Sequence, residues 1–165
     1  MSQDQLFDPL RGAWTRVSPS LATLRMLTRA LPLLVVAVAL VVAALLVPGA
    51  RWWILASAVL VAGGAAWTAG WALRNQRSWG YSETEDELLI TSGVMFKRLV
   101  AVPYGRMQFV DVQAGPIERS LGIANVTLHT ASSETAATIP GVPTDEATRL
   151  RNRLTELGEA RGAGV

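Results

Sequence analysis

The sequence predicts a hairpin of two transmembrane helices followed by a small α+β module, in which a β-sheet is covered by one C-terminal helix. Two uninterrupted apolar blocks lie close together in the first half of the chain, and the second half alternates apolar and polar residues over short runs. The last stretch carries apolar residues at helical spacing. Half of the residues are hydrophobic and only 17% are charged, against about a quarter in soluble proteins. Part of the chain is therefore expected to lie in lipid.

The first two predicted elements form the hairpin. One helix is predicted over about 30–47 and the other over 52–73, and each is long enough to cross roughly 30 Å of hydrocarbon. Between them, Pro48 and Gly49 begin a turn that leaves room only for a direct reversal of the chain. The alternative, two buried helices of a soluble protein, requires a larger domain around them than this chain supplies.

The charges around the hairpin predict its orientation. Arginines gather at its outer ends and only one lies in its turn: Arg25, Arg29, Arg74 and Arg77 against Arg51. Because cytoplasmic flanks carry an excess of Lys and Arg, both termini are expected in the cytoplasm. Residues 1–29 would then be a cytoplasmic N-terminal segment, 30–73 the hairpin, and 74–165 a cytoplasmic module.

Small residues recur at four-residue intervals in the second span, for example at Ala62, Ala66 and Gly70. Such residues let helix backbones approach closely in lipid. We expect them to pack against the first span, with contact between two copies of the chain as the alternative.

From residue 74 onward, short alternating runs predict the strands of a half-buried sheet. The runs are Trp79/Tyr81, Leu88/Ile90, 96–102, 107–112, Val126/Leu128 and 135–139. Turns are predicted at Gly93 and around Gly105, and a short helical turn closed by glycine is predicted over 115–122.

The chain is predicted to end in a helix that begins after Pro143 and is closed near Gly158. Its apolar positions fall on one stripe: Ala147, Leu150, Leu154 and Leu157. That stripe must cover an apolar surface, and the preceding sheet is the only candidate. The expected architecture is a small open barrel or sandwich capped by this helix.

The residue inventory gives no catalytic or metal site. The chain has no cysteine, which excludes disulfides, thiolate nucleophiles and Cys-ligated metals. His129 follows Leu128 on an alternating strand, so its ring is expected to face away from the core. Ser132 and Ser133 have no base near them in sequence. The acidic run at 83–87 lacks the spacing of a calcium loop, so it is expected to be a solvated hairpin turn. No enzyme activity, metal or cofactor is predicted.

The charge balance also bears on partners. Residues 74–165 contain ten basic and eleven acidic side chains, so the module lacks the overall positive charge of a nucleic-acid-binding domain. No nucleic acid partner is predicted.

Several short segments occur in the order of a known family. They read Arg-Ser-Trp-Gly-Tyr at 77–81, Ile-Thr-Ser-Gly-Val at 90–94, Val-Pro-Tyr-Gly-Arg-Met-Gln-Phe-Val at 102–110, the glycine-bounded segment 115–122, Thr-Ala-Ser at 130–132 and Ile-Pro-Gly-Val at 139–142. In this order after a two-helix hairpin, they resemble the bacterial pleckstrin-homology-like membrane proteins of the YdbS type.

The resemblance implies a pleckstrin-homology (PH)-like module, in which two roughly orthogonal antiparallel sheets are capped by the C-terminal helix. It also implies the bacterial plasma membrane and a frequent larger relative that carries several copies of the module. It implies no reaction, because the family has no established catalytic residues.

Polar residues beside the predicted turns are the candidate contact residues. Arg106 and Gln108 are expected to share one strand face, opposite Met107 and Phe109, and they match the family pattern. Together with Arg119 they are the candidates for binding a partner. A structural hydrogen-bonding role is the alternative for Arg106 and Gln108.

A second group of residues is expected at the membrane interface: Arg74, Arg77, Trp79, Lys97 and Arg98. Arg77 and Trp79 directly follow the second span, where such side chains anchor helices. Lys97 and Arg98 are an adjacent basic pair that could contact anionic lipid.

These features favour a membrane-tethered, non-enzymatic binding or assembly module that is part of an envelope-associated complex. The expected partners are the lipid bilayer and a protein, either a larger relative with several such modules or a second copy of the chain. The alternative is a module that binds anionic lipid headgroups. An intramembrane enzyme or transporter would need ionisable groups within the spans, and neither block contains one.

Overall fold

The computed structural model describes residues 14–130 and 137–162. The chain forms two compact units, which are described separately. The helical unit is Ala22–Arg74, and the sheet unit combines Met1–Leu21 with Asn75–Val165.

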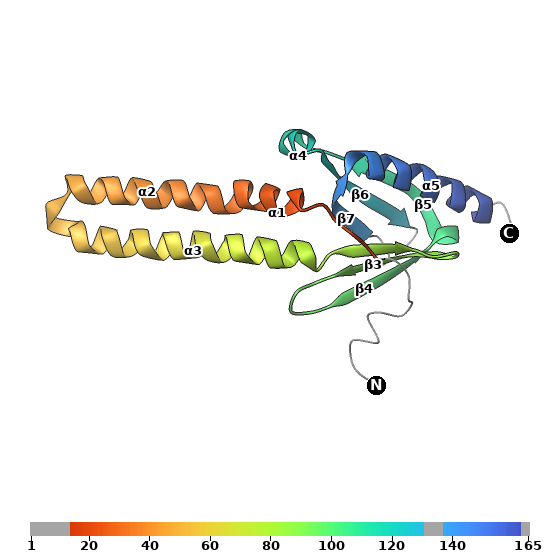
Figure 1. Ribbon diagram of the computed structural model, residues 1–165, viewed down its shortest axis with the longest axis horizontal. Coiled ribbons are helices and arrows are strands. Elements are labelled where there is room, and N and C mark those ends of the chain that lie inside the picture. The colour runs from red at the N-terminus through yellow and green to blue at the C-terminus, as the bar shows by residue number, and fades with distance from the viewer. Residues whose placement is uncertain (1–13, 131–136, 163–165) are drawn as a thin grey trace. The chain divides into compact units, whose positions relative to one another are not determined.

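Two long antiparallel helices make the hairpin (Figure 1). The first is continuous through α1 (Ser20–Arg25), the π-helical turn η2 (Met26–Ala30) and α2 (Leu31–Leu46). The 3-10 turn η3 (Pro48–Ala50) reverses the chain into α3 (Arg51–Arg77). Both helices, of 27 and 30 residues with the turns included, are long and apolar enough to cross a membrane.

The helices extend beyond the predicted apolar blocks. The first begins at Ser20 instead of residue 30, and the second ends at Arg77 instead of residue 73. Helical hydrogen bonding does not require apolar side chains, and the added stretches contain neither Pro nor Gly to stop it.

Small residues of α3 pack against the first span, as expected, but among the predicted examples only Ala62 borders the space between the helices. The buried side chains are Ala37 and Ala44 in α2 and Ala58, Ala65 and Ala72 in α3. Their seven-residue spacing keeps them on one stripe of each helix, which we call the alanine seam. Ala66 and Gly70 lie instead on the exposed side of α3, and a Cβ atom at Gly70 would meet nothing within 4 Å. The expectation that Ala66 and Gly70 pack against the first span is wrong.

The first sheet of the sheet unit has four antiparallel strands. They are β1 (Thr15–Arg16), β2 (Gly80–Glu83), β3 (Glu87–Ser92) and β4 (Arg98–Pro103), paired in that order. The helical hairpin is thus inserted between two neighbouring strands of one sheet. The sequence indicated β2, β3 and β4 but not β1.

The second sheet has three antiparallel strands, β5 (Met107–Gln113), β6 (Ile123–Thr130) and β7 (Ala137–Pro143), in that order. The turn η4 (Tyr104–Arg106) leads into β5, and the short helix α4 (Pro116–Ser120) connects β5 to β6. The chain closes with α5 (Thr144–Gly162), which contacts η4 and all three strands (Figure 1). The predicted arrangement of antiparallel sheets capped by a C-terminal helix is confirmed.

The core lies between the two sheets and α5. Its largest fully buried side chains come from both sheets and from α5: Tyr81, Leu88, Val102, Tyr104, Ile123, Val126, Leu128, Ile139, Val142, Leu150 and Leu154. Of the predicted stripe of α5, Ala147, Leu150 and Leu154 have no exposed surface, and Leu157 is half-buried. The helix continues past Gly158, which lies close to η4 and β5.

The segment before the first span contributes to the sheet unit as well. Val17 and Leu21 are each only 2% exposed. The backbone N–H of Ser18 donates to the Gly141 carbonyl at 2.9 Å, and the Gln76 side chain donates to the Val17 carbonyl at 3.0 Å. Gly141 has φ +69°, and a Cβ atom there would lie 2.7 Å from the Leu21 Cβ. A glycine is therefore required where this segment crosses β7.

Candidate functional site

Strand β5 is an edge of the three-stranded sheet, because within the described residues it pairs only with β6. Its start is fixed by Tyr104, whose buried hydroxyl donates to the Thr84 carbonyl at 3.0 Å. Arg106 is exposed and lies in the η4 turn, just before the strand begins.

A β-bulge at the start of β5 changes the expected alternation. Met107 is opposite Thr130 and Phe109 is opposite His129, so Gln108 is the extra residue between them. The sequence had indicated that Arg106 and Gln108 share one face of a regular strand. They do not, because Arg106 precedes the strand and Gln108 is the bulged residue.

The bulge turns the Phe109 side chain outward. Regular alternation had predicted that Phe109 faces the other side of the strand from Gln108. Its side chain is 57% exposed, and its ring stacks on His129 with the centroids 4.2 Å apart and the planes 12° from parallel. The prediction that His129 faces away from the core is confirmed, because its neighbour Leu128 is fully buried and His129 is not. Its aromatic partner could not be read from the sequence.

A groove of about 180 Å³ runs between β5 and α5. Its lining is Met107, Gln108, Phe109 and Val110 from the strand and Leu154, Thr155, Gly158 and Glu159 from the helix. Gly158 lies beside Met107 in the groove, since a Cβ atom there would make an ordinary van der Waals contact with the Met107 Cε at 3.8 Å. An open strand edge beside a shallow helical wall suits an extended peptide, which adds a strand and places alternate side chains in the groove. We call this site the β5 groove.

Arg119, the third predicted contact residue, is not part of the β5 groove. It is exposed on α4, which follows the other end of β5. The seven residues of β5 separate it from Arg106 by roughly 20 Å at about 3.3 Å per residue. The structure thus brings Gln108 to the groove and Arg106 to its entrance, and places Arg119 elsewhere.

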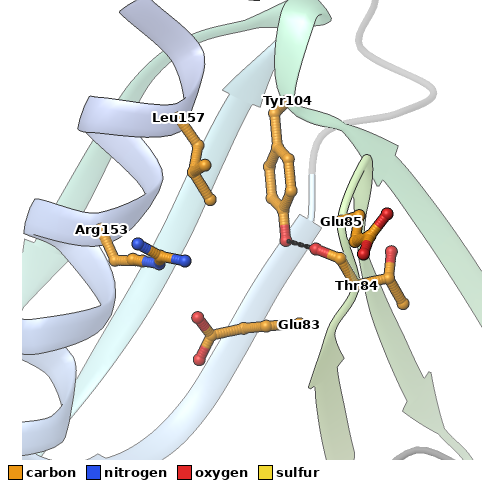
Figure 2. Close-up of a pocket in the computed structure, with 6 residues that line it drawn as sticks. All are labelled: Glu83, Thr84, Glu85, Tyr104, Arg153 and Leu157. Atoms are coloured by element: carbon orange, nitrogen blue, oxygen red, sulfur yellow. Dashed lines mark hydrogen bonds between the residues drawn. The ribbon is translucent and has the colours of Figure 1, made fainter. Parts of the chain in front are cut away.

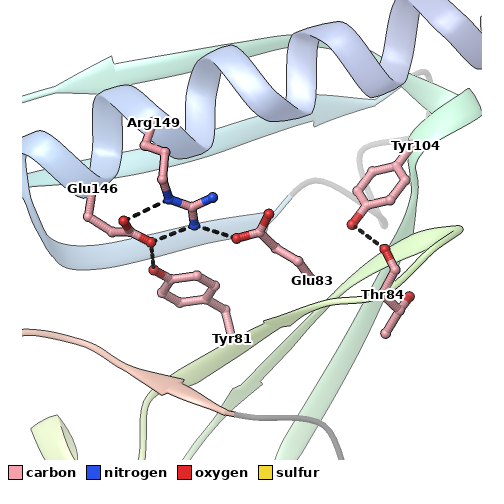
Figure 3. Close-up of polar contacts among 6 residues, drawn as sticks. All are labelled: Tyr81, Glu83, Thr84, Tyr104, Glu146 and Arg149. Atoms are coloured by element: carbon pink, nitrogen blue, oxygen red, sulfur yellow. Dashed lines mark hydrogen bonds and ion pairs between the residues drawn. The ribbon is translucent and has the colours of Figure 1, made fainter.

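A set of polar contacts holds α5 to strand β2 (Figure 3). The Tyr81 hydroxyl donates to Glu146 at 2.8 Å, and the Arg149 guanidinium donates to Glu146 at 2.6 and 2.8 Å and to Glu83 at 2.5 Å. The hydrogen bonds from Arg149 are the largest cause that lowers the pKa of Glu146, while burial is the main cause that raises the pKa of Tyr81. We call these four residues the α5 clasp.

A second hollow, of about 420 Å³, lies near the clasp (Figure 2). Glu83, Thr84, Glu85, Tyr104, Arg153 and Leu157 line it. Burial raises the pKa of Tyr104, so its hydroxyl stays a hydrogen-bond donor. Across residues 14–130 and 137–162, no group of three acidic or His side chains could hold a metal ion.

The acidic turn beside this hollow is tied to α5. Asp86 pairs with Arg161 at 2.8 Å, and the Arg161 guanidinium lies 5.5 Å from the centre of the Tyr104 ring. With Glu83 in the α5 clasp, two acids of the run 83–87 have arginine partners on α5. The sequence predicted only a solvated turn here.

The residues predicted at the membrane interface lie in two regions, the end of α3 with the connection to β2, and the start of β4 with the residue before it. Arg74 and Arg77 are exposed near the end of α3, and the indole of the half-buried Trp79 donates to the Asn75 side chain at 3.1 Å. Lys97 and Arg98 are exposed at the start of β4. Their contact with lipid stays a prediction. Ser132 and Ser133 lie outside the described residues.

Comparisons with known proteins give two matches. Residues 21–158 match the bacterial PH domain family. The chain is also 37% identical over 79 residues to the transmembrane protein YdbS of Bacillus subtilis (strain 168), an alignment that covers 48% of each protein. The chain thus spans about half the length of that relative. No solved structure matches the chain.

Proposed function

Because the chain belongs to the bacterial PH domain family, we propose that it is a membrane-tethered, non-enzymatic assembly module whose sheet unit binds an extended segment of a protein partner along β5. The observation that supports this function best is the β5 groove, where an unpaired strand edge, an exposed aromatic ring and a helical wall lie together. The chain is a membrane protein with two transmembrane helices.

The backbone of the edge strand supplies the affinity in this proposal. An added strand would hydrogen-bond to the N–H and C=O groups of β5 that do not face β6. The stacked rings of Phe109 and His129 offer a flat apolar surface for one side chain of the partner. Arg106 at the entrance and Glu159 on the helix wall carry opposite charges, which favours one direction of the bound segment.

The membrane and its side are part of the same proposal. We place the sheet unit in the cytoplasm at the bacterial plasma membrane, since the arginines gather at the outer ends of the hairpin. The pairing of β1 with β2 supports a hairpin whose two ends lie on one side, because these strands flank it in the chain. The partner would be a larger relative with several PH-like modules or a second copy of the chain.

A photocrosslinking experiment in native membranes tests the β5 groove. A photoreactive residue in place of Gln108 should give a protein adduct, and one in place of Thr138, which is exposed on the other edge strand, should not. Phe109→Asp should reduce the adduct about tenfold or more, because it puts a charge where an apolar contact is made. Arg106→Ala should have a smaller effect.

The controls separate binding from folding. Both Phe109 and Arg106 are exposed, so their variants should melt within a few degrees of the wild type. Equal adducts at Gln108 and Thr138, or none at Gln108, would contradict the proposed function.

Cysteine labelling tests the orientation. The natural chain contains no cysteine, so Ala50→Cys in the hairpin turn and Ser120→Cys on α4 can each be labelled alone. In intact cells an impermeant thiol reagent should label the protein with Ala50→Cys only. Labelling of Ser120→Cys would place the sheet unit outside the cytoplasm.

A further inference from the structure

The hairpin tip between β3 and β4 exposes two large apolar side chains in sequence. Met95 is 74% exposed and Phe96 is 83% exposed. In the described part of the sheet unit, the other strongly exposed large apolar residues are Phe109 at 57% and Ile117 at 44%. Within the described residues of this unit, the tip is therefore the most apolar exposed point, and the β5 groove does not include it.

The tip lies at a defined end of the four-stranded sheet. The strand register places Arg16 opposite Gly80 and Gly80 opposite Thr91. Strand β3 ends at Ser92, which is opposite Arg98 at the start of β4, so the tip consists of residues 93–97. This is the end at which β1 leads toward the first span through 17–19, and at which α3 leads into β2 through 78–79. The chain therefore leaves the sheet unit for the first span, and returns to it from the second, at the end of the sheet that carries the tip.

Charges are separated along the same sheet. The end that carries the tip has four exposed basic residues: Arg16, Arg77, Lys97 and Arg98. The opposite end is the β2–β3 turn, with the acidic run Glu83, Glu85, Asp86 and Glu87. Arg149 and Arg161 of α5 pair with Glu83 and Asp86 at that end, so the near-neutral charge of the module conceals chiefly a basic cluster at the end that carries the tip. A basic end beside an anionic surface is attracted over about a Debye length.

The tip is also held in a fixed conformation. Gly93 has φ +102°, and a Cβ atom there would lie 1.9 Å from the Phe96 carbonyl oxygen. Only glycine fits this turn, because the backbone of Phe96 folds back over Gly93. The side chains of Met95 and Phe96 are exposed to solvent.

We propose that the β3–β4 tip inserts Met95 and Phe96 into the interface of the anionic bilayer that holds the spans, with Lys97 and Arg98 against lipid phosphates. The apolar pair leaves water when it enters the interface, and the adjacent basic pair gains from the negative surface potential. The tip thereby becomes a third, reversible attachment of the protein to the membrane. The occupant is lipid, since the basic charges match an anionic surface and the chain passes to both spans from this end of the sheet.

The full chain in liposomes tests the proposal. A small fluorophore on Val94→Cys reports from the tip without replacing the inserting residues, and the same fluorophore on Glu85→Cys reports from the opposite end of the sheet. In vesicles that mix neutral and anionic phospholipids, quenchers attached to the upper acyl chain should quench the Val94→Cys probe and leave the Glu85→Cys probe unaffected. A probe at Ser92→Cys serves if Val94→Cys does not fold.

Variants at the tip give the expected size of the effect. Met95→Ser with Phe96→Ser should lower the inserted fraction to the level of the Glu85→Cys probe, and Ile117→Ser on α4 is the matched control that should change nothing. Lys97→Gln with Arg98→Gln should lower the insertion equilibrium about tenfold or more, since each basic residue adds roughly fivefold near an anionic surface. This loss should vanish in vesicles of neutral lipid.

Two results would overturn the proposal. One is that the fluorophore on Val94→Cys is quenched no more than the fluorophore on Glu85→Cys. The other is a tip probe that stays exposed in pure liposomes but is shielded in native membranes, which would identify a protein as the occupant.

Discussion

The helical unit and the sheet unit bury opposite kinds of side chain. In the hairpin the buried residues are alanines, while Leu45, Trp52 and Leu60 are 68 to 80% exposed. In the sheet unit the fully buried residues include Tyr81 and Leu154.

This difference shows which solvent each unit is built for. In lipid a large apolar side chain gains nothing by turning inward, so close backbone approach decides the contact and alanine is favoured. In water the burial of large apolar side chains is the main driving force. Truncating a leucine should therefore lower the stability of the sheet unit strongly and that of the hairpin only slightly.

The largest expected effect is in the sheet unit. Leu154→Ala should destabilise it by about 2–5 kcal/mol, because the side chain is fully buried. Leu60→Ala, which removes a side chain 77% exposed on α3, should cost under about 0.5 kcal/mol. Urea unfolding of the full chain in mild detergent measures both. Similar losses from the two variants would remove the contrast.

The junction between β7 and the segment before the first span should also be sensitive. Gly141→Ala forces an L side chain to φ +69° and crowds Leu21, so about 1–2 kcal/mol for the conformation and roughly 1–3 kcal/mol for overpacking are expected. Gly122→Ala has nearly the same φ, +65°, but open space around it. It should show the conformational cost alone in the same urea experiment. Equal costs would mean that Leu21 does not pack against β7.

The alanine seam should resist enlargement. Ala65→Leu places a large side chain between α2 and α3, which should cost about 1–3 kcal/mol, whereas Ala66→Leu lies on the exposed side of α3 and should cost little. Unfolding of the reconstituted hairpin by titration with a denaturing detergent compares the two. A larger loss for Ala66→Leu would show that α3 presents a different face to α2.

The smallest effect concerns acid stability. The contacts with Arg149, and then with Tyr81, hold the pKa of Glu146 below its ordinary value of 4.5. The stability from the α5 clasp is therefore present above pH 4.5 and is lost as the pH falls through the lowered pKa. Glu146→Gln should remove part of the acid sensitivity of the melting temperature, and Glu156→Gln, on the same helix, should not. An unchanged acid profile for Glu146→Gln would show that the clasp contributes nothing.

Much of the fold could be predicted because periodicity reports burial. The two spans follow from the length of their uninterrupted apolar runs, and six of the seven strands and the stripe of α5 follow from runs with a clear period. The resemblance to YdbS-type proteins, confirmed by the family match, supplied the two-sheet arrangement. Strand β1 has two residues, which is too short to show any period. The alanine seam was missed because several small-residue stripes of α3 satisfy the same rule.

The candidate site was only partly predictable. Gln108 was chosen for its polarity and does line the groove, but Phe109 was expected inward because alternation assumes a regular strand. A single bulge shifts that alternation by one residue, and nothing in the sequence marks it. Glu159 and Thr155 reach the site from α5, which is a tertiary contact that local patterns cannot report.

The position of β1 has a consequence for how the protein is made. Thr15 and Arg16 leave the ribosome before either span, while their partners Tyr81 and Gly80 are synthesised only after both. The four-stranded sheet therefore cannot be completed until the hairpin has been translated and both of its ends lie on one side of the membrane. A chain in which only one span crosses would hold β1 and β2 apart, with Val17 and Leu21 left uncovered. The four-stranded sheet can therefore form only in chains whose two spans have both been inserted.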